Sequence, residues 1–121
     1  MTLKGTERLP KSARLLKRTE FLKLSRTGAK LQLANFIVIS RANHRAESRL
    51  GITVSGKVGN AVIRNRIKRQ VREFFRRRRG TVQPGTDILV IARKSAAGLP
   101  GPSIESELGR VLSHQSSRRR A

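Results

Sequence analysis

Residues 61–72 read Ala-Val-Ile-Arg-Asn-Arg-Ile-Lys-Arg-Gln-Val-Arg and predict an amphipathic helix. At about 100° per residue, the apolar side chains fall on one face: Ile63, Ile67, Val71 and Phe74. The opposite side carries Arg64, Asn65, Lys68, Arg69, Arg72 and Arg76. Between positions 64 and 79 there are nine Arg or Lys residues against one acid, Glu73. A packed face backed by this much positive charge predicts a surface that holds a polyanion.

The charge of the whole chain favours a nucleic acid as that polyanion. The formal net charge is +21 over 121 residues, and self-repulsion of this size destabilises a lone compact state. Bound phosphates replace repulsion by attraction, and released counterions add a salt-dependent driving force. The alternative is a nonspecific cationic protein or a membrane-surface binder. We disfavour it because the basic residues belong to a folded, interrupted pattern.

Length and composition predict one domain, residues 1–121, with its core at about 12–115 and basic flexible arms at 1–11 and 116–121. The chain has no Cys, which excludes disulfides, Cys-based zinc sites and thiol chemistry. No apolar run has transmembrane length, and no signal-type stretch follows the basic N-terminus. We therefore expect a cytoplasmic protein without a membrane partner.

The predicted elements follow the order helix, strands, helix, strand, helix. Thr19 is the expected N-cap of a first helix that ends near Gly28. Strands are predicted at 30–33, 35–41 and 50–55, and the spacing of the last two suits an antiparallel hairpin. The basic helix is predicted at 60–79, a buried strand at 87–92, and a last helix capped by Ser103.

This order is typical of an α+β or mixed α/β sandwich in which helices cover a small sheet. The step from strand 50–55 through the basic helix to strand 87–92 resembles a β-α-β unit. The usual rule would make such a parallel crossover right-handed.

No autonomous active site is visible in the sequence. The histidines, His44 and His114, have no acid or metal-ligand partner at a useful spacing. The seven acids include no pair of the kind that a two-metal nuclease requires. Glu105 and Glu107 come nearest, but they diverge by about 200° on a helix. We therefore predict no catalytic residue and no metal site in this chain.

Two features remain open on spacing alone. The segment 56–60, Gly-Lys-Val-Gly-Asn, lacks the ending of a nucleotide phosphate loop. It is either a turn or a Gly-rich approach to an RNA phosphate. Phe21 and Phe36 are either core residues or platforms on which bases stack. The arginines of the basic helix are better placed, since their forked donors match phosphate oxygens.

The run 59–69, Gly-Asn-Ala-Val-Ile-Arg-Asn-Arg-Ile-Lys-Arg, resembles the Arg-Asn-Arg signature of the bacterial ribonuclease P protein subunit. Val71-Arg72-Glu73 continues the match. Further matching segments occur in the family's order: Arg14-Leu15, Glu20-Phe21, residues 50–55 (Leu-Gly-Ile-Thr-Val-Ser) and residues 88–94. The resemblance covers about residues 12–115, and its long motif is specific.

The resemblance implies an α-β-β-β-α-β-α order in a two-layer α+β sandwich of the ribosomal protein S5 domain 2-like type. Its small mixed four-stranded sheet would carry a left-handed β-α-β crossover, and we adopt this hand over the usual rule. The implied function is that of an accessory protein in an endoribonuclease. It would bind a large catalytic RNA and promote removal of the 5′ leader from precursor tRNA. Mg²⁺ would be held mainly by the RNA subunit and the substrate, and no obligate protein partner is expected.

The resemblance also assigns site residues. Contacts to the catalytic RNA are expected from Asn60, Arg64, Asn65, Arg66, Lys68, Arg69 and Arg72. The cleft between the first helix and the sheet would receive the leader, with Phe21, Phe36, Lys57, Arg93 and Lys94 in or beside it. The chain departs from the family where aromatics are common, at Leu24-Ser25 and Ile39, and where a basic residue is common, at Gly56. We therefore expect leader binding to depend more on charge, and so to be unusually sensitive to salt.

Two rival functions remain at this stage. One is a purely structural RNA-binding protein, such as a ribosomal component. The other is an autonomous metal-dependent nuclease, which the scarcity of acids disfavours.

Overall fold

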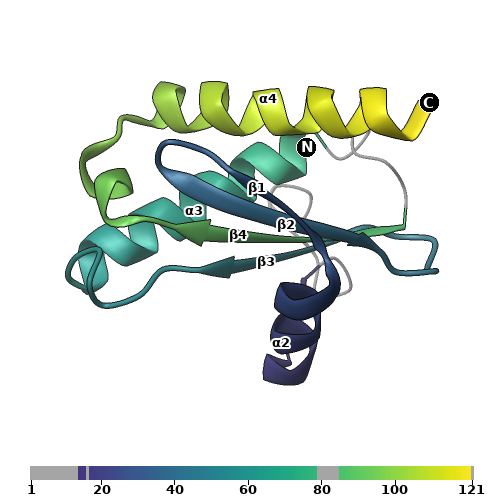
Figure 1. The fold of residues 1–121 in the computed structure, drawn as a ribbon. Helices are drawn as coiled ribbons and strands as arrows, with labels where there is room; N and C mark the ends of the chain where they lie inside the picture. Colours follow the sequence, from purple (N-terminus) through teal and green to yellow (C-terminus); the bar gives the residue numbers. More distant parts are fainter. Residues whose placement is uncertain (1–13, 16, 79–84, 121) are drawn as a thin grey trace, which may run out of the picture.

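The computed structural model describes residues 14–15, 17–78 and 85–120, with residues 112–120 described by their backbone alone. The elements are α2 (Arg18–Thr27), β1 (Ala29–Gln32), β2 (Phe36–Ala42), β3 (Arg49–Thr53), α3 (Ala61–Arg77), β4 (Thr86–Ala92), the short 3-10 helix η3 (Lys94–Gly98) and α4 (Gly101–Arg120) (Figure 1). This succession confirms the predicted α+β class and the α-β-β-β-α-β-α order.

The four strands form one mixed sheet in the order β1-β2-β4-β3. β1 and β2 pair antiparallel, as do β2 and β4, whereas β3 runs parallel to β4 with Leu50 opposite Ile88. The expected hairpin between strands 35–41 and 50–55 is therefore wrong, because β4 lies between them. β4 takes this central place because it is apolar on both faces, which suits an interior strand. The hand of the β3-α3-β4 crossover stays a prediction of the family resemblance.

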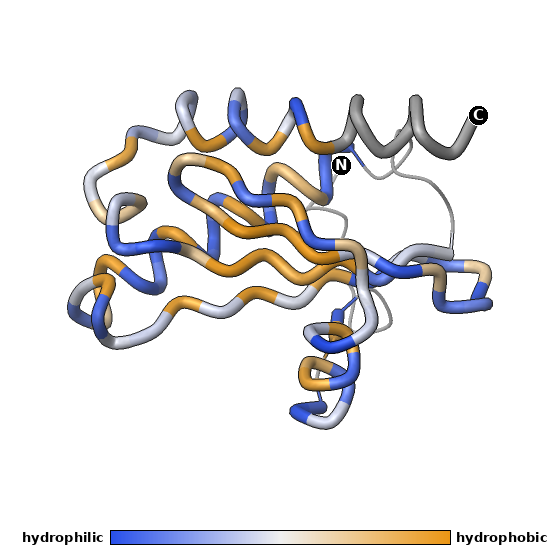
Figure 2. The backbone as a smooth tube through the Cα atoms, viewed as in Figure 1, coloured by the Kyte–Doolittle hydropathy of each residue, from blue (hydrophilic) through white to orange (hydrophobic). Residues whose placement is uncertain are grey.

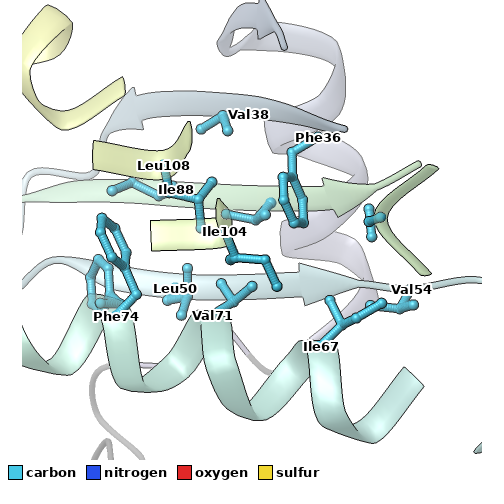
Figure 3. Close-up of a cluster of buried hydrophobic side chains, with 14 of the residues drawn as sticks. Phe36, Val38, Leu50, Val54, Ile67, Val71, Phe74, Ile88, Ile104 and Leu108 are labelled. Atoms are coloured by element: carbon cyan, nitrogen blue, oxygen red, sulfur yellow. The ribbon is translucent and has the colours of Figure 1, made fainter. Parts of the chain in front are cut away.

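The main core lies between the sheet and the pair α3 and α4. Alternate residues of the strands face it, and Figure 3 shows Phe36 and Val38 of β2 with Ile104 and Leu108 of α4 in this interior. The strands are the most hydrophobic part of the described chain (Figure 2). These two layers are the predicted sandwich.

The opposite face of the sheet carries α2 (Figure 1). Its contact is a smaller buried cluster made of Leu15, Leu24, Ile39 and Leu89. Gly28 ends α2 with φ −80°, so its conformation is open to any residue. Glycine is required there by close approach, because a Cβ would lie 2.5 Å from Ile39 Cγ2. The end of α2 can therefore sit directly on β2.

Two predicted helix starts are wrong, and the last helix extends into the predicted C-terminal arm. α2 begins at Arg18, with Lys17 at the N-cap position and no side-chain cap, so Thr19 lies inside the helix. α4 begins at Gly101 rather than after Ser103, since a proline at position 102 fits the first turn, where its missing N–H costs no helical hydrogen bond. α4 also continues to Arg120, because residues 116–120 contain neither Gly nor Pro. The predicted arm at 1–11 lies outside the described residues.

Across the helices of the described chain, none combines the length and the apolar character needed to cross a bilayer.

Candidate nucleic-acid interface

Helix α3 has a buried apolar side and an exposed polar side, as the sequence predicts. Ile67, Val71 and Phe74 are buried against the sheet, while Asn65 and Arg69 are exposed on the outer side. The helix is a rigid support, so the spacing of these outer side chains is fixed before any ligand arrives. The predicted division of α3 into a core face and a cationic face is confirmed for these residues.

Asn60 also holds the start of α3. Its side-chain Oδ1 accepts a hydrogen bond from the backbone N–H of Ile63 at 3.0 Å, which satisfies one of the donors that a helix N-terminus leaves open. Asn60 is nevertheless exposed. The residue predicted as an RNA contact is thus an exposed N-cap.

Arg64 does not project fully from α3, contrary to the sequence prediction, and neither does Arg66, which was predicted as an RNA contact. Both are half-buried. Arg64 Nη1 donates to the Gly59 carbonyl at 3.2 Å, and Arg66 Nη2 donates to the Leu99 carbonyl at 2.7 Å. A guanidinium has five N–H donors, so each side chain can brace the fold and still offer donors to a phosphate.

Arg72 is an exposed cation of α3 that lies near another positive charge, Arg14. Burial of part of the side chain, followed by repulsion from Arg14, holds the pKa of Arg72 below its usual range. Arginine remains charged at neutral pH despite such a shift. A bound phosphate would offset both the desolvation and the repulsion.

A groove of about 520 Å³ opens between α2 and the sheet, around the end of β3. Its walls are apolar, with cations and hydroxyls among them: Arg18, Phe21, Leu22, Ser25, Ile52, Thr53, Val54, Lys68, Leu89 and Ile91. Lys68 comes from α3, so the groove adjoins the flank of the basic helix. An apolar groove bordered by cations suits a single strand whose bases lie inside and whose phosphates lie at the rim.

Only one of the two predicted cleft aromatics lines this groove. Phe21 does so from α2, whereas Phe36 is fully buried in the main core. The assignment of Phe36 to the cleft is wrong. Successive strand residues point to opposite faces, and on β2 the position of Phe36 points toward the same interior as Val38 (Figure 3).

The three basic residues predicted beside the cleft lie outside its lining. Lys57, Arg93 and Lys94 are all exposed. Arg93 follows Ile91 by two positions at the end of β4 and donates from Nη1 to the Leu33 carbonyl at 3.1 Å. Lys57 sits in the turn before α3, and Lys94 opens η3. They extend the positive surface without forming the groove.

Several groove residues were missed by sequence reasoning. Arg18, Leu22 and Ser25 share one face of α2 at helical spacing, a signal that was present in the sequence. Thr53 and Ile91 are brought together by the parallel pairing of β3 with β4. That second signal depends on the strand order, which local patterns do not reveal.

The acidic residues are used within the fold. A carboxylate with an intramolecular partner is found in Glu20, Glu73, Asp87, Glu105 and Glu107. The most buried of these contacts involves Arg49, which is 9% exposed and donates to Asp87 at 2.9 and 2.7 Å and to Glu20 at 2.9 Å. The hydrogen bonds with Asp87 are the largest cause that raises the pKa of Arg49 above its usual range, against the opposing effect of burial.

Burial alone would raise the pKa of Asp87, but hydrogen bonds from Arg49 and Asn43 outweigh it and leave the pKa below its usual value. Asp87 is therefore held as a carboxylate. Within the part of the chain that the structure covers, no three His, Cys, Asp or Glu residues gather in a way that could hold a metal ion.

The chain is similar to known proteins over most of its length. The family model described as Ribonuclease P matches residues 9–116. The ribonuclease P protein component of Desulforapulum autotrophicum is 49% identical over 108 residues, which cover 89% of this chain and 92% of that protein. The ribonuclease P protein component of Thermotoga maritima is 46% identical over 89 residues, or 74% of this chain and 76% of that protein.

Solved structures of RNase P proteins are also similar to this chain. The RNase P protein of Staphylococcus aureus superposes with a TM-score of 0.81 at 36% identity, covering 87% of this chain and 96% of that one. The RNase P protein of Thermotoga maritima gives a TM-score of 0.77 at 39% identity, covering 84% and 96%.

Proposed function

Because the chain belongs to the ribonuclease P protein family, we propose that it is the accessory protein of a ribonuclease P holoenzyme. It works with the catalytic RNA and promotes endonucleolytic removal of the 5′ leader from precursor tRNA. One observation carries the assignment beyond the family name. Five of the described carboxylates are engaged inside the protein, while α3 contributes Lys68 to a groove whose apolar and cationic lining suits a single strand.

The cationic side of α3 is the docking face for the catalytic RNA. Asn65, Arg69 and Arg72 are exposed on it, and the remaining donors of Arg64 and Arg66 lie on its borders. Arginine forks bind phosphate oxygens two at a time. Fixed at helical spacing, they suit the backbone of a folded RNA rather than a flexible polyanion.

The groove beside α3 receives the leader of the precursor. Phe21 offers the ring on which one base stacks, while Arg18 and Lys68 are placed for the neighbouring phosphates. Ser25 and Thr53 add hydroxyl groups that can exchange hydrogen bonds with a base or a ribose 2′-OH. The protein thereby adds contacts to the substrate that the catalytic RNA lacks, because the RNA has few cationic groups.

Catalysis belongs to the RNA in this proposal. Five of the described carboxylates are held by protein partners, and no group of metal-ligating side chains forms among the described residues. As the family resemblance implies, Mg²⁺ would be held mainly by the RNA subunit and the substrate. The protein's own contribution is to bind, orient and neutralise phosphate charge.

Reconstitution tests the proposal. Cleavage of precursor tRNA is measured at low magnesium with the protein alone, the catalytic RNA alone, and both together. We expect strong cleavage only from the combination. Cleavage by the protein alone would instead support an autonomous nuclease, and no change in the RNA's activity would support a structural RNA-binding protein.

A matched pair of variants then tests the docking face. Arg69→Ala removes an exposed cation from the outer side of α3, and we expect it to weaken assembly with the catalytic RNA. Arg77→Ala removes the same charge from the same helix, but its side chain pairs with Glu73 and Glu105. Equal loss of assembly in both variants would contradict a specific docking face.

A further inference from the structure

Helix α2 forms one wall of the groove, but its buried apolar contact with the sheet is small. It contributes Arg18, Phe21, Leu22 and Ser25 to the lining, whereas Leu24 is its one fully buried residue. The cluster that receives Leu24 is much smaller than the core under α3 and α4. Apolar burial alone therefore fixes the position of this wall only weakly.

The contacts of Arg49 with Glu20 and Asp87, called the Arg49 tether below, compensate for this small apolar contact. Arg49 at the start of β3 donates from Nη1 to Glu20 Oε2 on α2 at 2.9 Å. The same guanidinium holds Asp87 at the start of β4 through Nε at 2.9 Å and Nη2 at 2.7 Å. Asn43 donates to Asp87 at 2.7 Å and fixes the carboxylate further. One side chain thus joins α2 to both strands that form the floor of the groove.

We propose that Arg49 and Glu20 are positioning residues that hold α2 at the distance from β3 and β4 which fits the RNA leader. The inference rests on the proposed function, in which the groove receives that leader. Neither residue lines the groove, so both act through the place of α2. A planar guanidinium with donors in fixed directions suits this role, because it sets the geometry of both carboxylates at once.

Because Glu20 is negatively charged, the direction in which its replacement changes RNA affinity tests the inference. Glu20 adds negative charge to the wall of a site for phosphates, so its removal should strengthen RNA binding if charge were its only effect. Loss of the tether predicts the opposite result, since a displaced wall loses contacts with the leader. The two accounts therefore predict changes in opposite directions for one substitution.

The experiment compares Glu20→Ala with Glu105→Ala in the reconstituted holoenzyme. Each variant removes one carboxylate that accepts from an arginine at 2.9 Å, and each raises the net charge by one unit. Glu105 ties α4 to α3, away from the groove. The Arg49–Asp87 contact stays in both variants, so β3 and β4 keep their pairing. The quantity measured is the affinity for precursor tRNA with its leader divided by the affinity for mature tRNA.

We expect Glu20→Ala to lower this ratio about fivefold, which corresponds to about 1 kcal/mol. Glu105→Ala should leave it unchanged, and Glu20→Gln should fall between, because its carbonyl can still accept from Arg49. Hydrogen exchange should become faster in α2 and stay unchanged in α3.

The inference is overturned if Glu20→Ala leaves the ratio unchanged or raises it, or if exchange in α2 is unaffected. It is also overturned if assembly with the catalytic RNA weakens by the same factor as leader binding, since a general structural role would do that. A ratio near one in the wild-type holoenzyme would instead refute the leader site itself.

Discussion

Replacing Phe21 by Leu isolates the stacking contribution of the groove. The chain has four Phe and neither Tyr nor Trp. Phe36, Phe74 and Phe75 are at most 3% exposed, so Phe21 is the one aromatic ring that a leader base can reach. Leucine keeps an apolar side chain against the Leu15 cluster and removes the flat ring. The substitution therefore separates stacking from packing.

The expected loss of affinity is that of one stacking contact, because only one ring is available. Stacking on an aromatic side chain contributes about 1–3 kcal/mol per base. Loss of one such contact should weaken binding of leader-bearing precursor about 5- to 150-fold. Binding of mature tRNA should stay unchanged, because that RNA does not enter the groove.

Phe36→Leu is the matched control, since sequence reasoning placed both phenylalanines in the cleft. Phe36 is fully buried, so the same substitution there should cost stability, roughly 1 kcal/mol, without changing leader affinity. Equilibrium binding of fluorescent precursor and mature tRNA to the holoenzyme gives the affinities, and urea unfolding gives the stabilities. Loss of leader affinity in Phe36→Leu with none in Phe21→Leu would refute the assignment of the groove.

Three further predictions follow from single contacts. Arg72→Gln should reduce the slope of log affinity against log salt by about 0.7–0.9, the value for one phosphate contact, and an unchanged slope in a salt titration would remove Arg72 from the RNA interface. The lowered pKa of Asp87 means that its stabilising effect is complete above the usual aspartate pKa of about 4 and is lost as pH falls through the lower native value. Asp87→Asn should therefore be less stable at neutral pH and show a flatter decline in acid, as urea unfolding at several pH values can check. Gly28→Ala should cost about 1–3 kcal/mol because its Cβ would meet Ile39 Cγ2 at 2.5 Å, while Gly98→Ala, with open space around it, should unfold at nearly the wild-type urea concentration.

Local patterns predicted the basic helix well and the sheet only in part. The 3.6-residue spacing of Ile67, Val71 and Phe74 located α3, because one helix buries one face. The apolar run 88–91 identified β4 as buried but not as the strand between β2 and β3. Strand order depends on contacts between distant segments, and the hairpin rule favoured the wrong neighbour.

The groove was harder to predict for the same reason. Phe21 and Phe36 look alike in sequence. Phe36 belongs to the main core because its side of β2 faces the interior, whereas Phe21 lines the groove from α2. The Arg49 tether joins positions that are 29 and 38 residues apart. No local pattern connects them, so the residue that fixes the wall of the site was invisible before the fold was known.

Crosslinking from the leader tests the central claim most directly. Precursor tRNA with a photoreactive base in its leader is bound to the holoenzyme, irradiated, and the attached peptides are sequenced. We predict crosslinks to α2 at Phe21 or Leu22 and to the end of β3 at Thr53. Crosslinks confined to the α4 side, such as Ser106 or Arg110, or a complete lack of protein crosslinks, would contradict the groove as the site of the leader.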